Sequence, residues 1–369
     1  MNAQEERQAF LRAVDQDTRL ALSRRGLLSV AAAGALTAGL APLSFAQAKR
    51  FEGRKLVHTS WGGVYQESQK AAYCEPFALE TGSRIIQDGP MNEAKLRTMV
   101  GGGSPDWDVC DVTDTFLFAG GSALFEKVDY KTVQRNLLVP EYAQEYGVGN
   151  NVWSYNVCYN TKSFAPGSGP KTWADIFDVK RFPGKRMFRN RVYSTLEIAL
   201  LADGVEPSKL YPLDVERAFR KLDTIRNDIT WWNTPSQSQQ LISDGAVTCG
   251  VIQNGRAFDA SRKGAPLAIE WAQNLRSVDY LVVLKGSKNV DVAMHLINRS
   301  IQADAQARFV NATAYAPVTP EAFTKVENSL LPWLASQKDN AARGVTIDGK
   351  WWSDKLESMN DRWNKWRVA

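Results

Sequence analysis

The chain has 369 residues, of which 44% are hydrophobic and 23% are charged. The 45 Lys and Arg residues and the 40 Asp and Glu residues are interspersed, which excludes a strongly basic nucleic-acid-binding or membrane-binding patch. With only two histidines and no Cys-x-x-Cys pair, the sequence also argues against a zinc site. No long apolar run follows the N-terminal region, so we expect no membrane span there.

The first 48 residues have the order of an export signal. Arg24 and Arg25 precede an uncharged stretch over 26–45, which is rich in Ala, Gly and Leu. The stretch ends at a small-x-small site, Ala46-Gln47-Ala48. The paired arginines indicate the twin-arginine route, and a membrane anchor is the alternative because the stretch is about long enough to span. We expect cleavage after about Ala48 and a periplasmic protein without a lipid anchor, since no Cys follows the cut.

Strand-like and helix-like segments alternate along the remaining 320 or so residues. Strands are predicted at 56–60, 108–112, 152–159, 246–252 and 280–284. Helices are predicted at 65–80, after Thr172, after Asp214, after Asn289 and from Thr319-Pro320. The Thr172 helix has Asp175 in the capping-box position. This alternation predicts an α/β fold with mainly parallel sheets.

Three of the four cysteines, Cys110, Cys158 and Cys249, are predicted to be buried free thiols. Cys110, Cys158 and Cys249 lie inside apolar, strand-like stretches, and Cys74 lies in a helix-like one. An oxidising compartment would permit disulfides, in three possible pairings. The twin-arginine route carries folded proteins, so folding in the reducing cytoplasm argues against structural disulfides.

Short segments spread over nearly the whole chain after residue 48 resemble one family, the solute-binding proteins of bacterial ABC importers. The similarity is to the spermidine/putrescine-binding group. The segments that carry it are Trp61-Gly62-Gly63, Glu75-Pro76-Phe77, Asp106-Trp107-Asp108-Val109, Tyr159-Asn160-Thr161, Thr172-Trp173-Ala174-Asp175, Phe182-Pro183-Gly184-Lys185, Tyr211-Pro212-Leu213-Asp214, Asn254-Gly255-Arg256, Leu284-Lys285-Gly286 and Trp351-Trp352.

The resemblance implies a two-lobed, type II periplasmic-binding-protein-like fold with a ligand cleft between the lobes. Lobe 1 would comprise 49–152 and 254–315, and lobe 2 would comprise 153–253 and 316–369 with a C-terminal helix. The chain would cross between lobes near Asn150, Asn254 and Tyr315. A monomer would close on a small-molecule ligand and deliver it to the ABC permease subunits in the inner membrane. No cofactor, metal, catalytic residue or nucleic-acid partner is expected.

The implied ligand is a polyamine such as putrescine or spermidine, held by aromatic faces and by carboxylates. The candidate ligand-binding residues, taken from the resemblance and from the chemistry of the side chains, are Trp61, Gly62, Gly63, Thr113, Asp114, Arg191, Trp232, Asn254, Glu270, Trp271, Asp279 and Tyr280. For each tryptophan the alternative is packing in the core. For each acid the alternative is a solvated surface charge.

The acidic half of this pattern departs from the polyamine-binding group. Asn190 and Arg191 stand where acids would be expected, and Gln253 stands where the family often has Trp. Arg189 or Arg191 in a cleft would repel an ammonium group and could hold a carboxylate in a bidentate grip. A zwitterionic amino acid such as γ-aminobutyrate, or another small organic solute, therefore remains an alternative ligand.

Two other classes of function fit the sequence less well. An enzyme on the same scaffold would need a base beside a nucleophile such as Cys158 or Cys249, and only His58 and His295 are available as histidines. No nucleophile-elbow, Walker or dinucleotide-binding motif occurs. A ferric-ion-binding protein would want adjacent tyrosines, and the sequence has no Tyr-Tyr pair.

Overall fold

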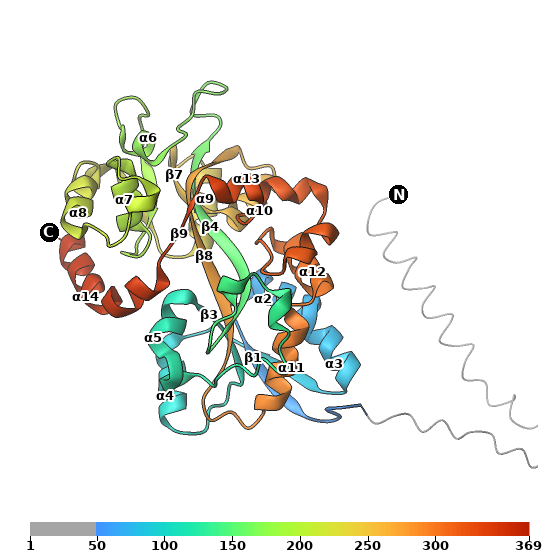
Figure 1. Ribbon diagram of the computed structural model, residues 1–369. Helices are drawn as coiled ribbons and strands as arrows, with labels where there is room; N and C mark the ends of the chain where they lie inside the picture. Colours follow the sequence, from blue (N-terminus) through green and yellow to red (C-terminus); the bar gives the residue numbers. More distant parts are fainter. Residues whose placement is uncertain (1–48, 369) are drawn as a thin grey trace, which may run out of the picture. The chain divides into compact units, whose positions relative to one another are not determined.

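A mixed nine-stranded sheet runs through the protein in the computed structural model, which describes residues 49–368 (Figure 1). The predicted export signal lies outside the described residues. The strands are β1 (Lys55–Thr59), β2 (Arg84–Asp88), β3 (Val109–Thr113), β4 (Val148–Asn160), β5 (Arg186–Arg189), β6 (Ile229–Trp232), β7 (Cys249–Gln253), β8 (Leu267–Val283) and β9 (Val345–Thr346). Their order is β2-β1-β3-β8-β4-β7-β5-β6, with β9 paired to β8.

Helices cover the sheet along most of its length. They are α2 (Gly63–Gln69), α3 (Glu75–Thr81), α4 (Glu93–Gly101), α5 (Asp114–Leu124), α6 (Trp173–Phe177), α7 (Thr195–Ala202), α8 (Val215–Asp223), α9 (Pro235–Ser243), α10 (Asn254–Arg262), α11 (Val290–Ser300), α12 (Ala303–Thr313), α13 (Lys338–Ala342) and α14 (Gly349–Val368). A π-helical turn, Lys70–Cys74, joins α2 to α3. Within the described part of the chain, no helix is long and apolar enough to cross a membrane.

Two long antiparallel strands, β4 and β8, connect the two halves of the sheet. β3 pairs with the last five residues of β8, and β7 pairs with β4 over Tyr155–Tyr159. The α/β class is confirmed, and the sheet is mixed. The strand pairs β1–β2, β1–β3, β5–β6, β5–β7 and β8–β9 are parallel, as expected for most of the sheet. The expectation did not include the antiparallel centre: the chain crosses along β4 and returns along β8, so the pairs β3–β8, β4–β8 and β4–β7 are antiparallel.

We retain the boundaries of the two lobes as a proposal. Residues 267–270 of β8 still pair with the β4 segment that also contacts β7. This register favours a return to the first half within β8 over a return near Asn254. Figure 1 shows β4 and β8 running between the β7 end and the β3 end of the sheet.

Local signals in the sequence explain where several helices begin. The Thr172 hydroxyl accepts the Asp175 N–H and the Asp175 carboxylate accepts the Thr172 N–H, which confirms the capping box of α6. Asp214 caps α8 through the Arg217 N–H. The helix predicted from Thr319-Pro320 is a 3₁₀ helix, Pro320–Lys325. All four cysteines are buried and free, as predicted for Cys110, Cys158 and Cys249.

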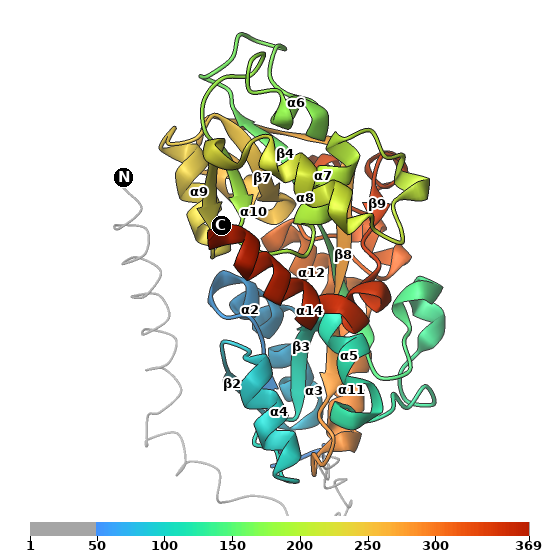
Figure 2. The ribbon, with the colours of Figure 1, turned by 90° about the vertical axis from the view of Figure 1, so that its left-hand side faces the viewer.

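The C-terminal helix α14 contacts both halves of the sheet (Figure 2). At its start, Gly349 lies against Asp114 of α5, where a Cβ atom would come within 2.9 Å of the carboxylate. Near its end, Arg362 pairs with Glu216 of α8, and the Trp363 indole N–H lies 3.3 Å from Asn190. The helix therefore follows the line along which the two halves meet.

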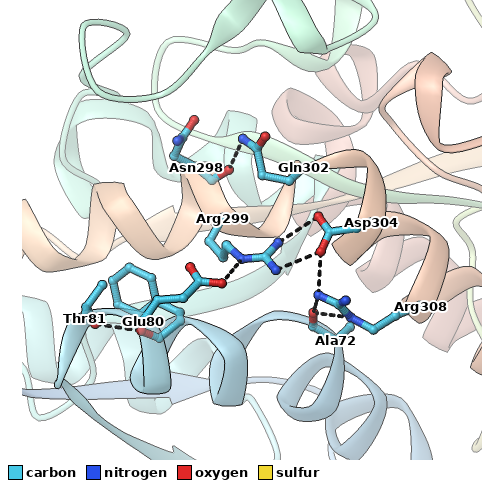
Figure 3. Close-up of polar contacts among 9 residues, drawn as sticks. Ala72, Glu80, Thr81, Asn298, Arg299, Gln302, Asp304 and Arg308 are labelled. Atoms are coloured by element: carbon cyan, nitrogen blue, oxygen red, sulfur yellow. Dashed lines mark hydrogen bonds and ion pairs between the residues drawn. The ribbon is translucent and has the colours of Figure 1, made fainter.

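Arg299, at the end of α11, ties three helices together (Figure 3). Its guanidinium lies 2.8 Å from Asp304 of α12 and 3.2 Å from Glu80 of α3. Arg308 also pairs with Asp304, at 2.9 Å, and donates to the carbonyl of Ala72 in the π-helical turn. The network fixes this turn against α12.

We expect Arg299→Ala to lower the free energy of unfolding by about 1–2 kcal/mol, because the Arg299 side chain is only 14% exposed but its acidic partners remain partly solvated. Urea denaturation would measure this loss. The exposed Lys209–Glu206 pair supplies the control, since Lys209→Ala should cost less than about 0.5 kcal/mol. Equal losses in the two variants would contradict a structural role for the Arg299 network.

Candidate functional site

A cavity of about 220 Å³ lies where strands and helices from both halves of the sheet converge. Its walls come from the ends of β1, β3, β5 and β7, from β4 and β8, and from the segment after α12. They are formed by Trp61, Tyr65, Thr113, Thr115, Trp153, Arg189, Arg191, Tyr193, Pro235, Gln253, Arg256, Asp279 and Tyr315. The carboxyl ends of parallel strands are where open α/β sheets bind ligands.

The amino-terminal ends of helices reach this cavity. Thr113 is the N-cap of α5, Pro235 is the first residue of α9, and Gln253 precedes α10. In the described part of the chain, no side chain caps α10, so its first-turn N–H groups lack a side-chain acceptor. Helix N-termini carry partial positive charge, which favours an anionic group at this end of the cavity.

Three arginines add full positive charge to the wall. Among residues 49–368, Arg189, Arg191 and Arg256 have no carboxylate within ion-pairing distance, unlike Arg54, Arg299 and Arg362. Arg189 donates to the hydroxyl of Tyr155, and the buried Nε of Arg256 has no hydrogen-bond partner in the described structure. Burial, with Arg189 nearby, lowers the pKa of Arg191. Glu93 is an acidic neighbour of Arg191, but among residues 49–368 it forms no ion pair with it within 4 Å.

One carboxylate, Asp279, lines the same cavity. It is only 7% exposed, and its Oδ1 accepts the Trp153 indole N–H at 3.0 Å. Behind it, fully buried Asp111 accepts the Trp61 indole N–H at 3.2 Å. Burial raises the pKa of both carboxyl groups, that of Asp111 to about 7. The cavity therefore contains one acidic wall residue and three basic ones.

Aromatic rings form much of the remaining wall. Tyr65 and Tyr315 meet edge-to-face with ring centroids 5.8 Å apart. Trp153 packs edge-to-face on Tyr155 at 5.0 Å, and Trp61 hydrogen-bonds to Asp111. Rings fixed in this way can cover a methylene chain and attract an ammonium group through their faces.

Four of the predicted ligand-binding residues lie in the cavity wall, namely Trp61, Thr113, Arg191 and Asp279. Gly62 and Gly63 have φ of 76° and 59°, which glycine adopts without strain, and border a separate hollow beside α2. Asp114 is buried behind the wall, where it accepts the Tyr193 hydroxyl at 3.2 Å.

Like Gly62, Gly63 and Asp114, the other five predicted residues lie outside this wall: Trp232, Asn254, Glu270, Trp271 and Tyr280. Trp232 is fully buried, with the Arg189 guanidinium 5.5 Å from its ring centroid. Fully buried Asn254 is bonded to the backbone of Ser154, Ala314 and Trp333.

Glu270, Trp271 and Tyr280 lie outside the wall because of their positions along β8. Side chains alternate along a strand, so Asp279 faces the cavity while its neighbour Tyr280 packs against Phe118. Glu270 and Trp271 lie in the first part of β8, away from the wall. Contact of these residues with a ligand stays a prediction.

Arg189, which the sequence offered as an alternative to Arg191 for holding a carboxylate, also lies in the wall. Several wall residues were not among the candidates from sequence: Tyr65, Thr115, Trp153, Tyr193, Pro235, Gln253, Arg256 and Tyr315. Most stand at a strand end or in the first turn of the next helix. A place at or shortly after the end of a predicted strand was the sequence signal that could have identified Thr115, Tyr193, Gln253 and Arg256 as cavity residues. Trp153 lies inside β4, and only the pairing of the two long strands brings it to the cavity.

Comparison with known proteins decides the family. Residues 72–341 match the family model described as bacterial extracellular solute-binding protein. The chain belongs to this family. Over 332 residues, 88% of this chain and 94% of the relative, it is 33% identical to a gamma-aminobutyric acid-binding protein of Pseudomonas aeruginosa. A spermidine/putrescine-binding periplasmic protein of Salmonella typhimurium is 23% identical over 86% of this chain and 92% of its own length.

Solved structures agree with this membership. A GABA receptor structure superposes with a TM-score of 0.81 at 40% identity, covering 85% of this chain and 98% of its own. An ABC transporter substrate-binding protein from Bradyrhizobium japonicum gives 0.81 at 35% identity, over 85% and 99%. The two-lobed periplasmic-binding-protein fold is confirmed. The protein is an ABC-importer substrate-binding protein, which binds a small ligand and works with a permease, and it is not an enzyme.

Proposed function

We propose that the protein is a periplasmic binding protein that captures a small ω-amino acid, with γ-aminobutyrate as the best-supported candidate. The observation that carries the proposal is the charge arrangement of the cavity. Arg191 and Arg256 lie without acidic partners in the same small cavity as Asp279. A solute with a carboxylate at one end and an ammonium group at the other supplies both missing charges.

The carboxylate is proposed to bind between Arg191, Arg256 and the uncapped start of α10. Guanidinium groups hold carboxylates through paired N–H donors, and the helix end adds favourable potential. The ammonium group is proposed to bind Asp279, with the rings of Trp61 and Trp153 beside it. The cavity, at about 220 Å³, is smaller than the roughly 300–1,000 Å³ typical of pockets for drug-sized ligands, which suits a short solute.

A polyamine is the second candidate, supported by the aromatic walls and by the relatives named for spermidine and putrescine. Its second ammonium group would face the arginines. Two like charges about 4 Å apart repel by about 4 kcal/mol at an effective dielectric constant near 20. The arginines therefore favour the amino acid over the diamine. The relative named for γ-aminobutyrate, at 33% identity, supports the same choice.

The protein would deliver the solute to the permease in the way that the sequence resemblance implies. The lobes, 49–152 with 254–315 and 153–253 with 316–369, would close on the solute by a hinge motion. The closed protein would then dock on the permease. A twin-arginine signal over 1–48 would place it in the periplasm, the compartment named for its polyamine-binding relatives.

Isothermal titration calorimetry of residues 49–369 tests the proposal with four matched compounds. γ-Aminobutyrate carries both charges, butyrate lacks the amine, putrescine lacks the carboxylate, and spermidine is a longer polyamine. We expect γ-aminobutyrate to bind at least about 100-fold more tightly than the others, because each omission leaves a buried charge unpaired. Tight putrescine or spermidine binding without a response to γ-aminobutyrate would overturn the proposal.

A further inference from the structure

A single phenol lies between two buried carboxylates at the acidic side of the cavity. The Tyr65 hydroxyl oxygen is 2.9 Å from Asp111 Oδ2 and 3.3 Å from Asp279 Oδ2. The same oxygen accepts an N–H of Asn151 at 2.6 Å. A phenol has one hydrogen to donate, so Tyr65 can satisfy only one of the two carboxylates at a time.

The two carboxylates differ in their other partners. Asp111 also accepts hydrogen bonds from Gln69 at 2.5 Å and Asn150 at 2.8 Å, in addition to the Trp61 indole. Asp279 has only the Trp153 indole besides Tyr65. Asp111 is therefore the better stabilised anion. Asp279 is the residue exposed to an incoming solute.

No Lys, Arg or His of residues 49–368 pairs with either carboxylate within 4 Å. The ionisable groups around them are Asp114 at the start of α5, Tyr73 in the π-helical turn, and Tyr315 after α12, with Arg256 of α10 beside Tyr315. Asp114 adds like charge when ionised, and the tyrosines are neutral at physiological pH. Two buried negative charges without a cation repel strongly, so the pair binds a proton instead.

We infer that Asp111 and Asp279 share one proton in the empty cleft, and that an ammonium group binding beside Asp279 releases it. The inference rests on the proposed function for the binding of an ammonium-bearing solute. In the step, the carboxyl O–H bond breaks, the proton passes to solvent, and the Asp279 carboxylate pairs with the ammonium group. Asp111 does not line the cavity; it acts as a positioning residue that sets the charge of Asp279.

The proton release determines how the affinity for the solute depends on pH. The empty protein binds one more proton than the complex, so the affinity for the amine should rise with pH up to about tenfold per unit where the pair is protonated. The effect should level off above the pH at which the pair loses its proton. Burial raises the pKa of both members, that of Asp111 to about 7, which places this range above the usual range of a carboxylate.

Titration calorimetry with γ-aminobutyrate in two buffers of different ionisation enthalpy, such as phosphate and Tris, tests the inference at neutral pH. For the wild type we expect release of a substantial fraction of one proton per solute bound. Asp111→Asn removes the like charge and so lowers the pKa of Asp279, although the burial of Asp279 remains. This variant should still bind, with clearly less proton release than the wild type and a rise of affinity with pH that levels off at a lower pH.

Asp114→Asn is the graded control, because Asp114 is buried nearby and adds like charge when ionised, but bonds to Tyr193 and not to Tyr65. It should keep more of the proton release than Asp111→Asn does. Tyr65→Phe provides a second variant, in which loss of the shared phenol should change the number of protons released.

Wild-type binding without proton release would overturn the inference and leave the proposed function standing. Release that disappears in Asp114→Asn and persists in Asp111→Asn would also overturn it. Failure of the wild type to bind any amine would overturn the proposed function, and the inference with it.

Discussion

Replacing Arg256 with glutamine should weaken γ-aminobutyrate binding at least about 30-fold. The proposed solute carboxylate would lose a charged donor in a site closed off from most solvent, and truncating one partner of such a pair costs about 2–5 kcal/mol. Arg256 is the sharpest position for this test because its buried Nε has no hydrogen-bond partner in the described structure. Under the proposed function, the solute carboxylate is an acceptor for this guanidinium.

The control for Arg256→Gln lies on the same helix. Arg262 is exposed and close to Asp259, so Arg262→Gln should leave the dissociation constant within about twofold. Circular dichroism and thermal unfolding of both variants would establish that each is folded. If Arg256→Gln binds γ-aminobutyrate as the wild type does, the carboxylate does not bind at Arg256. If the variant gains affinity for putrescine instead, the cation-repelling role of Arg256 is supported independently.

Much of the fold could be predicted because the signals that determine it are local. Capping residues located the starts of α6 and α8, and apolar β-branched runs located β1, β3 and β4. The direction of pairing could not be predicted in the same way. Whether β8 runs parallel or antiparallel to β3 depends on where the chain crosses between the two halves of the sheet. The residue pattern within either strand does not indicate where that crossing occurs.

The cavity could be predicted only in part for a related reason. Trp61, Thr113, Arg191 and Asp279 stand at strand ends or beside them, and such positions meet at one edge of an α/β sheet. Trp232 and Asn254 carry equally suggestive side chains but are fully buried. An indole or amide that fills the core cannot be told by residue type from one that meets a solute. Only the packing in the folded structure distinguishes a core side chain from one that lines the cavity.

The departure of the sequence from the polyamine-binding pattern proved more informative than the resemblance itself. Arg191 stands where an acid would be expected, and the structure places it beside Arg189 and in the same cavity as Arg256. One arginine at such a position could simply be a solvated charge on the surface. Three arginines without an ion pair around one small cavity support the proposed site for a carboxylate, and this combination depends on β5 and β7 being neighbours in the sheet.

Replacing Arg186 with methionine should destabilise the protein by about 3–5 kcal/mol, the largest loss of stability that we predict. Arg186 begins β5 and is fully buried. Its Nε donates to the carbonyl of Ile176 at 2.9 Å, and its other nitrogens donate to carbonyls of Asp178, Phe182 and Gly184. Methionine fills a similar volume but donates nothing, so the four carbonyls would be buried without their donor.

Urea denaturation of Arg186→Met beside Lys185→Met would measure this effect. Lys185 is exposed and donates only to the Asn227 carbonyl, so its replacement should change the free energy of unfolding by less than about 0.5 kcal/mol. The carbonyls that Arg186 gathers belong to the loop leading into β5, the strand that carries Arg189 to the cavity. Losses of similar size in the two variants would show that the buried guanidinium does not organise this loop, and that packing of β5 between β6 and β7 is sufficient to hold Arg189 in place.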